Sequence, residues 1–141
     1  YYFNCWKGIL MATISQMLTA VEGLFASTAW TSNNIKAFPA NYQGEIDSDE
    51  WVRVSVLPFS SELAYQDVIA NGQIVCQIFV PAGAGMKRAY QIADLLKTLL
   101  DQEVISGYLQ TTNSFITNIG IDPKDAGLYN IDYTVNFRSI N

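Results

Sequence analysis

Apolar residues recur along this chain with two different periods, and each period predicts one kind of element. At residues 12–27 they follow the i, i+3, i+4, i+7 spacing of one helix face, which predicts a helix. The same spacing after Arg88 predicts a second helix that ends near Asp101. The apolar positions are Ile14, Met17, Leu18, Val21, Leu24 and Phe25 in the first helix and Ala89, Ile92, Ala93, Leu96, Leu99 and Leu100 in the second.

Strict alternation of apolar with other residues predicts three strands. The first covers residues 51–57, and Pro58 limits its ladder. The second, residues 72–80, has one apolar and one mixed face, and we expect it to run antiparallel to the first. The third, residues 128–138, has the clearest alternation, and we expect its Tyr133 to pack on the helices. The residues on the same face as Tyr133 are Tyr129, Ile131, Val135 and Phe137.

The remaining segments give weaker signals. Residues 103–112 and 114–119 predict two weaker strands, and residues 30–50 read as a long connection. Residues 60–71 fit neither period and end in a turn signal, so we interpret them as a long hairpin arm or loop. The order of elements lacks the regular alternation of a doubly wound parallel sheet. We therefore predict an α+β fold with a single antiparallel-rich mixed sheet and two main helices packed on one face.

The length of 141 residues fits one domain with one core. Residues 12–141 are expected to form that domain. Residues 1–11 precede it as an N-terminal extension, rich in aromatic residues but without either period. No apolar run reaches the roughly 18 residues that a membrane helix needs, so we expect a soluble, intracellular protein.

Charge and the absence of histidine exclude most chemistry. Thirteen acidic and eight basic residues give a net charge of −5, the wrong sign for gaining affinity from phosphates. The chain has no histidine, which removes the usual general base, the common zinc ligand and Ser-His or Cys-His dyads. We expect no enzyme activity, no catalytic residue, no metal and no cofactor.

Two other groups of residues are candidate sites. Cys5 and Cys76 lack CxxC spacing, so we interpret both as free thiols in a reducing compartment. The carboxylates of residues 45–50 lack the glycine and distal glutamate of a calcium loop, which favours a solvated, charged approach to the following strand.

The glycine loop at residues 82–88 leaves three interpretations open. The loop lacks the register and hydroxyl of a phosphate-binding loop, although Lys87 and Arg88 at a helix start favour an anion. Both cations are unfavourable for the helix dipole there, which suits a contact with an acidic partner. The plain alternative is a turn that joins a strand to a helix.

At this loop the sequence also resembles a known family. The stretches "WVRVSVLP", "NGQIVCQIFVPAGAGMKRAYQIADLLKTLL" and "GLYNIDYTVNFRSI" are similar to the small tail-terminator or tail-completion proteins of tailed bacteriophages. The resemblance covers residues 12–138. It implies a virion protein that forms a ring of six copies at the head-proximal end of the tail. Such a ring caps the tail tube, stops its polymerisation and joins it to the head.

The resemblance also implies partners: further copies of the chain, the tail tube protein and the head-tail connector or neck proteins. DNA would pass through the lumen without specific binding, and no membrane is involved. An arm at residues 61–70 is expected to reach a neighbouring subunit. The expected interface residues are Leu63, Tyr65, Asp67, Gln73, Gln77, Phe79, Lys87 and Arg88.

Two alternatives remain at this point. One is another head-tail connector or adaptor ring subunit, which differs in its partners and not in its chemistry. The other is a small phosphate- or nucleotide-binding domain that uses the 82–88 loop with Asp94 or Asp101.

Overall fold

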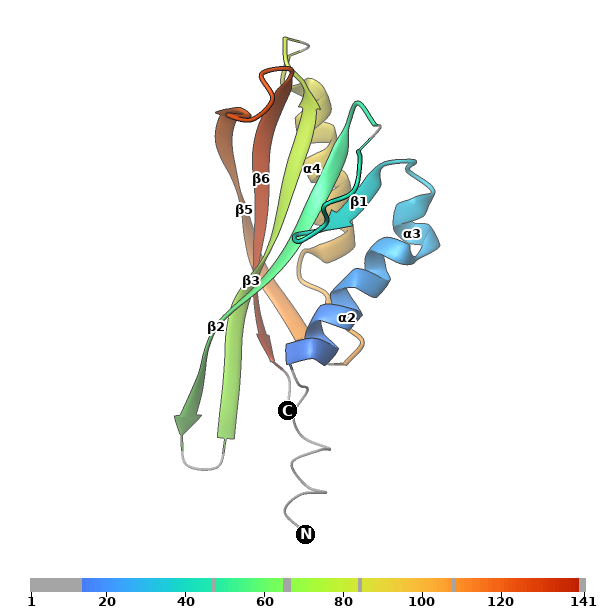
Figure 1. Ribbon diagram of the computed structural model, residues 1–141. Helices are drawn as coiled ribbons and strands as arrows, with labels where there is room; N and C mark the ends of the chain where they lie inside the picture. The colour runs from blue at the N-terminus through green and yellow to red at the C-terminus, as the bar shows by residue number, and fades with distance from the viewer. Residues whose placement is uncertain (1–13, 47, 65–66, 84, 108, 140–141) are drawn as a thin grey trace.

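The computed structural model describes residues 14–46, 48–64, 67–83, 85–107 and 109–139, with the backbone alone at Ile14 and at residues 58–64 and 67–70. Figure 1 shows one sheet with helices on one side. The helices are α2 (Ile14–Ala26), α3 (Thr28–Thr31) and α4 (Lys87–Leu100). The strands are β1 (Lys36–Pro39), β2 (Trp51–Ala64), β3 (Asp67–Pro81), β4 (Val104–Ile105), β5 (Leu109–Ile121) and β6 (Leu128–Ser139). The predicted extension 1–11 lies outside the described residues.

The six strands form one mixed sheet in the order β1-β2-β3-β6-β5-β4. β1 pairs with β2 in parallel, and the other neighbours are antiparallel. Together with α2 and α4 this arrangement confirms the predicted α+β fold. The expected antiparallel pairing of the first two long strands is also confirmed, for example by Val54 opposite Cys76.

The core lies between the sheet and the helices. α4 buries its predicted stripe, with Ile92, Leu96 and Leu100 fully covered, and α2 buries Met17 and Val21. Tyr133 is 1% exposed among the core residues, so its predicted place against the helices is confirmed. Burial of these apolar side chains is the main favourable term for the fold.

Buried hydrogen bonds hold the end of α4 against β5 and join α3 to the segment before β1. The Thr111 hydroxyl donates to the Leu100 carbonyl at 2.5 Å and accepts from the Glu103 backbone N–H at 2.6 Å, which ties the end of α4 to β5. Trp30 is buried, and its ring N–H donates to the Ile35 carbonyl at 2.9 Å. Each bond satisfies a polar group that burial would otherwise leave unpaired.

Three sequence predictions need correction. Residues 30–50 are not only a connection, because they contain the end of α3 and the short parallel strand β1. Residues 103–112 and 114–119 are not two strands of that extent. The structure has the short β4 and one long β5, in which the register shifts between Thr111 and Ser114. An irregularity of this kind interrupts the alternation of side chains between the two faces. The sequence pattern of one continuous strand then looks like that of two separate strands.

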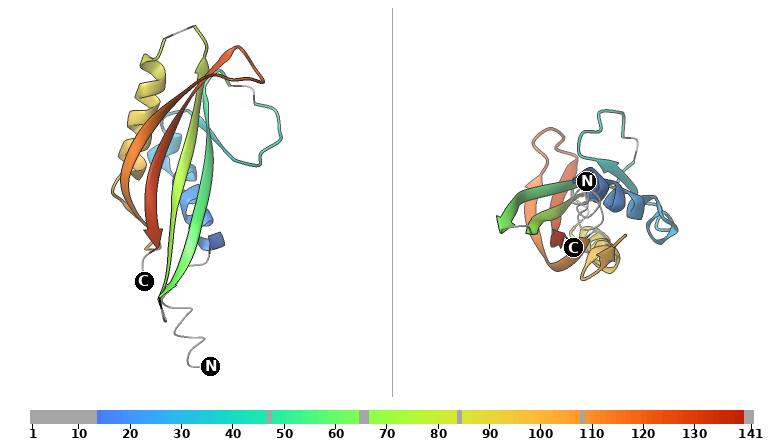
Figure 2. Two further views of the ribbon diagram at one scale, coloured as in Figure 1. Left: turned by 90° about the vertical axis from the view of Figure 1, so that its left-hand side faces the viewer. Right: turned by 90° about the horizontal axis from the view of Figure 1, so that it is seen from below.

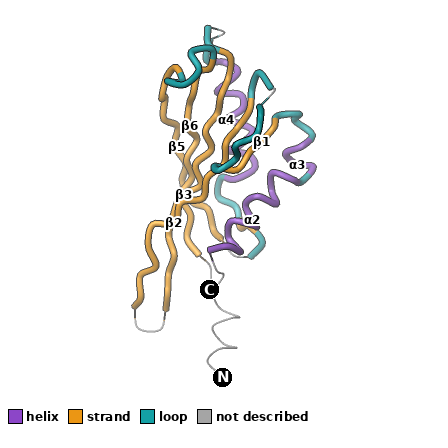
Figure 3. The backbone as a smooth tube through the Cα atoms, viewed as in Figure 1, coloured by secondary structure: helices purple, strands orange, loops and turns teal. Residues whose placement is uncertain are grey.

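The arm predicted at residues 60–71 is an extension of the β2–β3 hairpin, and not a loop. Its backbone pairing continues from Ser60 opposite Asn71 to Ala64 opposite Asp67. β3 pairs with β6 only from Asn71 onward, so the hairpin extends past the rest of the sheet (Figure 3). Gly72 stands where it leaves the sheet, and a side chain there would collide with the Leu57 carbonyl and the Phe137 ring.

Candidate interaction surfaces

The sheet has one face without helices, which we call the bare face. In the left view of Figure 2 the strands lie in front and the helices α2 and α4 behind them. The bare face carries the residues that alternate with the core positions. They include Trp51, Arg53, Ser55, Leu57, Gln73, Val75, Gln77, Phe79, Asn130, Asp132, Thr134, Asn136, Arg138, Phe115 and Thr117.

The bare face is mostly uncharged and rich in amides. The Gln73 amide donates to Asn136 Oδ1 at 3.1 Å, and the Asn136 amide donates to Asn113 Oδ1 at 3.2 Å. These bonds connect β3, β6 and β5 across the strands. Apolar side chains lie beside this ladder, since Leu57 and Phe115 are each 45% exposed. Such a mixture of ordered amides and exposed apolar groups is suited to contact with another protein.

One corner of the bare face is closed by aromatic packing. Phe79 is 5% exposed and stacks on Trp51 with ring centres 4.1 Å apart. The Arg53 guanidinium lies 5.2 Å from the Trp51 ring centre and 5.5 Å from that of Phe79. Within one chain the ring of Phe79, a predicted interface residue, is therefore packed inside this corner. Gln77 remains half-buried beside it.

One charged row crosses the bare face. The register places Arg53 on β2 opposite Gln77 on β3, and Gln77 opposite Asp132 on β6. Asp132 Oδ1 is buried and has no hydrogen-bond partner among the described residues. Burial raises the pKa of the Asp132 carboxyl, and a hydrogen bond with Asn130 partly opposes this shift. The ionised carboxylate is therefore poorly stabilised within a single chain.

The glycine loop connects β3 to α4, and its turn depends on backbone angles that glycine adopts readily. Gly83 and Gly85 have φ of 86° and 84°, a region that glycine adopts without strain, and Ala84 lies outside the described residues. The Met86 side chain does not cap the helix that follows. Asp94 lies two turns into α4, and Asp101 at its far end is roughly 20 Å from the loop, given 1.5 Å per residue. The geometry thus separates the loop from the carboxylates considered for a phosphate site.

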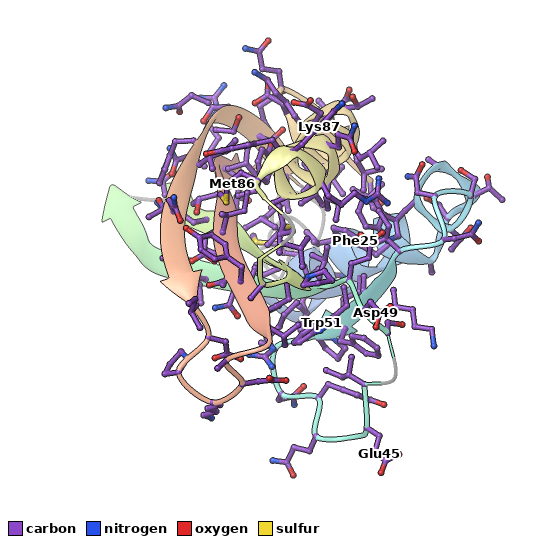
Figure 4. All side chains as sticks on the ribbon, turned by 90° about the horizontal axis from the view of Figure 1, so that it is seen from above. Phe25, Glu45, Asp49, Trp51, Met86 and Lys87 are labelled. Carbon is purple, nitrogen blue, oxygen red and sulfur yellow. The ribbon has the colours of Figure 1, made fainter. Side chains whose placement is uncertain are left out.

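The two cations after the loop have different surroundings. The Arg88 guanidinium donates to both carboxylate oxygens of Glu50, at 2.6 to 3.1 Å. This contact lowers the pKa of Glu50 and raises that of Arg88. Lys87 is exposed, and its side chain makes no hydrogen bond or ion pair with any described residue. Figure 4 shows Lys87 at one side of the molecule and Glu45 at the opposite side.

The remaining predicted interface residues belong to the projecting hairpin. Leu63 pairs with Val68, and Asp67 pairs with Ala64, close to the end of the hairpin. Tyr65 lies outside the described residues. The structure therefore groups the other seven predicted residues in three places: the hairpin, the bare face of β3, and the start of α4.

Sequence reasoning missed an apolar edge on β5. The outer side of β5 pairs with β4 only at Leu109 and Gln110, within the described residues. Ile116, Ile119 and Ile121 along it are 44%, 53% and 60% exposed. β5 contains no charged residue or proline, although such residues usually protect free strand edges. That absence was the signal available in the sequence.

The hollows on the described surface offer little chemistry. One of about 550 Å³ is lined by α2 and Ser106, with no ionisable side chain. Another of about 410 Å³ lies between Trp51 and the turn at Asp125 and Gly127, with Asp49 at its wall.

Nowhere in the described residues do three potential metal-binding side chains form a group. None of the described helices has the length and apolar character to cross a membrane. Cys76 is a buried free thiol, burial raises its pKa, and Cys5 lies outside the described residues.

Comparisons with known proteins give a fold likeness. No protein-family model and no curated protein sequence matches the chain. One similar solved structure, whose name states no function, has a TM-score of 0.59 and 16% identity, and the match covers 85% of this chain and 86% of that chain. A chain in the virion of a native gene transfer agent particle has a TM-score of 0.57 and 16% identity, with 86% of this chain and 92% of that chain covered. This protein shares its fold with a virion protein. At this identity the likeness concerns the fold.

Proposed function

We propose that this protein is a structural subunit of a phage or phage-like virion. Its copies form a closed ring, six by the family resemblance, at the head-proximal end of the tail. The ring caps the tail tube, stops its polymerisation and joins the tail to the head or neck. This role requires no catalysis and no cofactor. Its partners are other copies of the chain, the tail tube protein and connector or neck proteins.

The observation that carries the proposal is the fold shared with the gene transfer agent virion chain, over nearly the whole length of both chains. The surfaces of the molecule support it. The bare face, the β5 edge and the projecting hairpin are three separate places that a neighbour could cover. Contacts between different patches of identical chains generate rings when the rotation closes.

Purified protein and assembled particles test the proposal together. We expect concentration-dependent association into one closed species by sedimentation, and a ring with an open centre by electron microscopy. Particles made without the protein should carry tails of irregular length that are not joined to heads. Sedimentation as a monomer at every concentration, together with absence from finished particles, would contradict the proposal.

Tail length separates this role from that of another connector or adaptor ring. A terminator controls where the tube stops, so its loss should produce overlong tubes. Loss of a head-side adaptor should leave tubes of normal length that are unattached. A nucleotide-binding role would instead raise the melting temperature in the presence of nucleotide, because a ligand stabilises the state that binds it.

A further inference from the structure

Asp132 lacks a counter-charge on the bare face. Its carboxylate is half-buried, and Oδ1 finds no donor among the described residues. The neighbours in its row are Gln77 on β3 and Thr117 on β5, which are both uncharged. Arg53 lies beyond Gln77, with its guanidinium against the rings of Trp51 and Phe79. Removing a carboxylate from water costs free energy unless a cation or a donor meets it.

Lys87 has the opposite situation. It occupies the first turn of α4, where the positive end of the helix dipole disfavours a cation. Its neighbour Arg88 already holds Glu50, whereas the Lys87 side chain has no ionic or hydrogen-bonding partner in the described part of the chain. An anion close to Lys87 would offset the unfavourable position.

Lys87 and Asp132 cannot pair inside one chain. Asp132 lies on the bare face, and α4 packs on the opposite face of the sheet. In the left view of Figure 2 α4 lies behind the strands that carry the bare face. Two copies can bring the groups together if the helical layer of one lies on the bare face of the next.

The distance between Arg53 and Asp132 on the bare face is close to the distance between Lys87 and Asp94 on α4. Arg53 and Asp132 are two strands apart in one row, or about 9.6 Å at a strand spacing of 4.8 Å. Lys87 and Asp94 are seven residues apart on one side of α4, or about 10.5 Å. With α4 across this row, Lys87 meets Asp132 while Asp94 meets Arg53. Tyr90, which is 43% exposed, lies between the two α4 charges and supplies apolar contact.

We propose that α4 of one copy docks on the bare face of the next copy, with Lys87 paired to Asp132 and Asp94 paired to Arg53. The proposal rests on the ring function above and specifies its subunit contact. Front-to-back docking joins two different surfaces of the same chain, so each copy still has a free surface for another neighbour. A ring requires this kind of contact.

Charge reversal tests the contact in the full chain. Asp132→Lys places two cations together, and Lys87→Asp places two carboxylates together. Either change should weaken association about tenfold or more, because like charges at an interface are costly. The double variant Asp132→Lys with Lys87→Asp should restore association, since every contact then contains the exchanged pair. Sedimentation equilibrium gives the association constants, and circular dichroism at low concentration checks the fold.

Matched controls exclude a general charge effect. Lys124→Asp makes the same charge change as Lys87→Asp at an exposed position in the turn between β5 and β6, away from α4, and Glu103→Lys makes that of Asp132→Lys elsewhere. Both should associate as the wild type does. If Asp132→Lys does not fold, Asp132→Asn and the exposed Lys87→Asp still test the contact, and both should weaken association.

The outcomes separate this inference from the ring itself. Rings that form normally with Lys87→Asp, or a double variant no better than the single variants, would overturn the docking while leaving the ring function intact. A wild-type protein that never associates and is absent from particles would overturn both.

Discussion

Asp132 and Tyr133 are neighbours in the chain, but the pleat of β6 directs them to opposite faces of the sheet. Tyr133 is 1% exposed within the core, and Asp132 is half-buried on the bare face. Burial raises the pKa of Tyr133 to about 12, so its phenol stays neutral under ordinary conditions. Burial also raises the pKa of Asp132, which opposes ionisation. Tyr133 therefore stabilises the single chain, whereas the ionised carboxylate of Asp132 is unfavourable within it.

The core position should not tolerate a charge. Tyr133→Asp would place an unpaired carboxylate among apolar side chains and cost several kcal/mol, a large part of a typical 5–15 kcal/mol. We expect the variant to unfold or aggregate at room temperature, measured by circular dichroism and thermal melting. Ile119→Asp introduces the same side chain at a position of the same sheet that is 53% exposed, and it should melt close to the wild type. Similar melting of both variants would show that Tyr133 is not part of the core.

Removing the Asp132 carboxylate should stabilise the isolated chain. The native state binds the carboxyl proton more tightly than the unfolded state, because the native pKa is raised. Asp132 therefore destabilises the fold above its native pKa, and this effect disappears as pH falls through that pKa. At low protein concentration Asp132→Asn should melt higher than the wild type at pH 7, and the difference should close on acidification. A difference that is independent of pH, or a lower melting temperature for Asp132→Asn at pH 7, would contradict this account.

At the scale of elements, the β2–β3 hairpin combines two roles. Its first part, up to the region of Gly72, lies within the sheet between β1 and β6. Beyond that region β3 has lost its pairing with β6, and β1 pairs with β2 only at Trp51–Val54. The extended part therefore contributes hydrogen bonds within the hairpin but no strand pairing with the rest of the sheet. A two-stranded ribbon by itself is at best marginally stable in water.

Shortening this hairpin tests the division. Replacing residues 61–70 by a tight Asn-Gly turn should leave the circular dichroism and melting temperature nearly unchanged, because β3 and β6 keep their pairing from Asn71 onward. In particles, tails should fail to finish or heads should fail to join if the arm reaches a neighbour. If the shortened protein melts as early as Tyr133→Asp, the arm belongs to the core.

At the scale of the whole molecule, the protein has two layers, a sheet and a layer of helices. Its bare face, its β5 edge and its projecting hairpin lie at different places on this molecule. The helices cover one face of the sheet, and the other face is bare (Figures 1 and 2). The β5 edge and the projecting hairpin add backbone groups without a strand partner among the described residues. The net charge of −5 is also a property of the whole molecule, because its electrostatic field acts on charged ligands before any contact forms.

The charge predicts weak interaction with DNA. A protein gains affinity for DNA by neutralising phosphates and releasing their counterions, and a net negative chain lacks this term. We expect duplex DNA to bind more weakly than about 0.1 mM at physiological salt, measured by fluorescence anisotropy on the assembled species. Micromolar binding that strengthens as salt falls would contradict passive passage of DNA through a ring.

The sequence by itself determined the elements whose periodicity is long and regular. The stripe on α4, the alternation of β6 and the class of fold follow from the burial of one side of each element, a local consequence of side-chain order. The sequence also indicated the arm, since residues 61–70 fit neither period. It did not resolve β1, because four residues are too short to show a period, nor the single β5, whose register shift breaks the alternation.

Only the tertiary structure decided how the candidate residues are grouped. Glu50, directly before β2, and Arg88, at the start of α4, are far apart in the sequence, and the fold joins them in an ion pair. Strand order places Arg53 and Asp132 in one row, although β3 and β6 are not consecutive. Pairing between distant segments depends on how the sheet is assembled, and local pattern carries no information about strand order. The assignment of Phe79 and Lys87 to an interface stays a prediction. The closed aromatic corner and the partnerless Oδ1 of Asp132 could not be predicted from the sequence, because both depend on strand order.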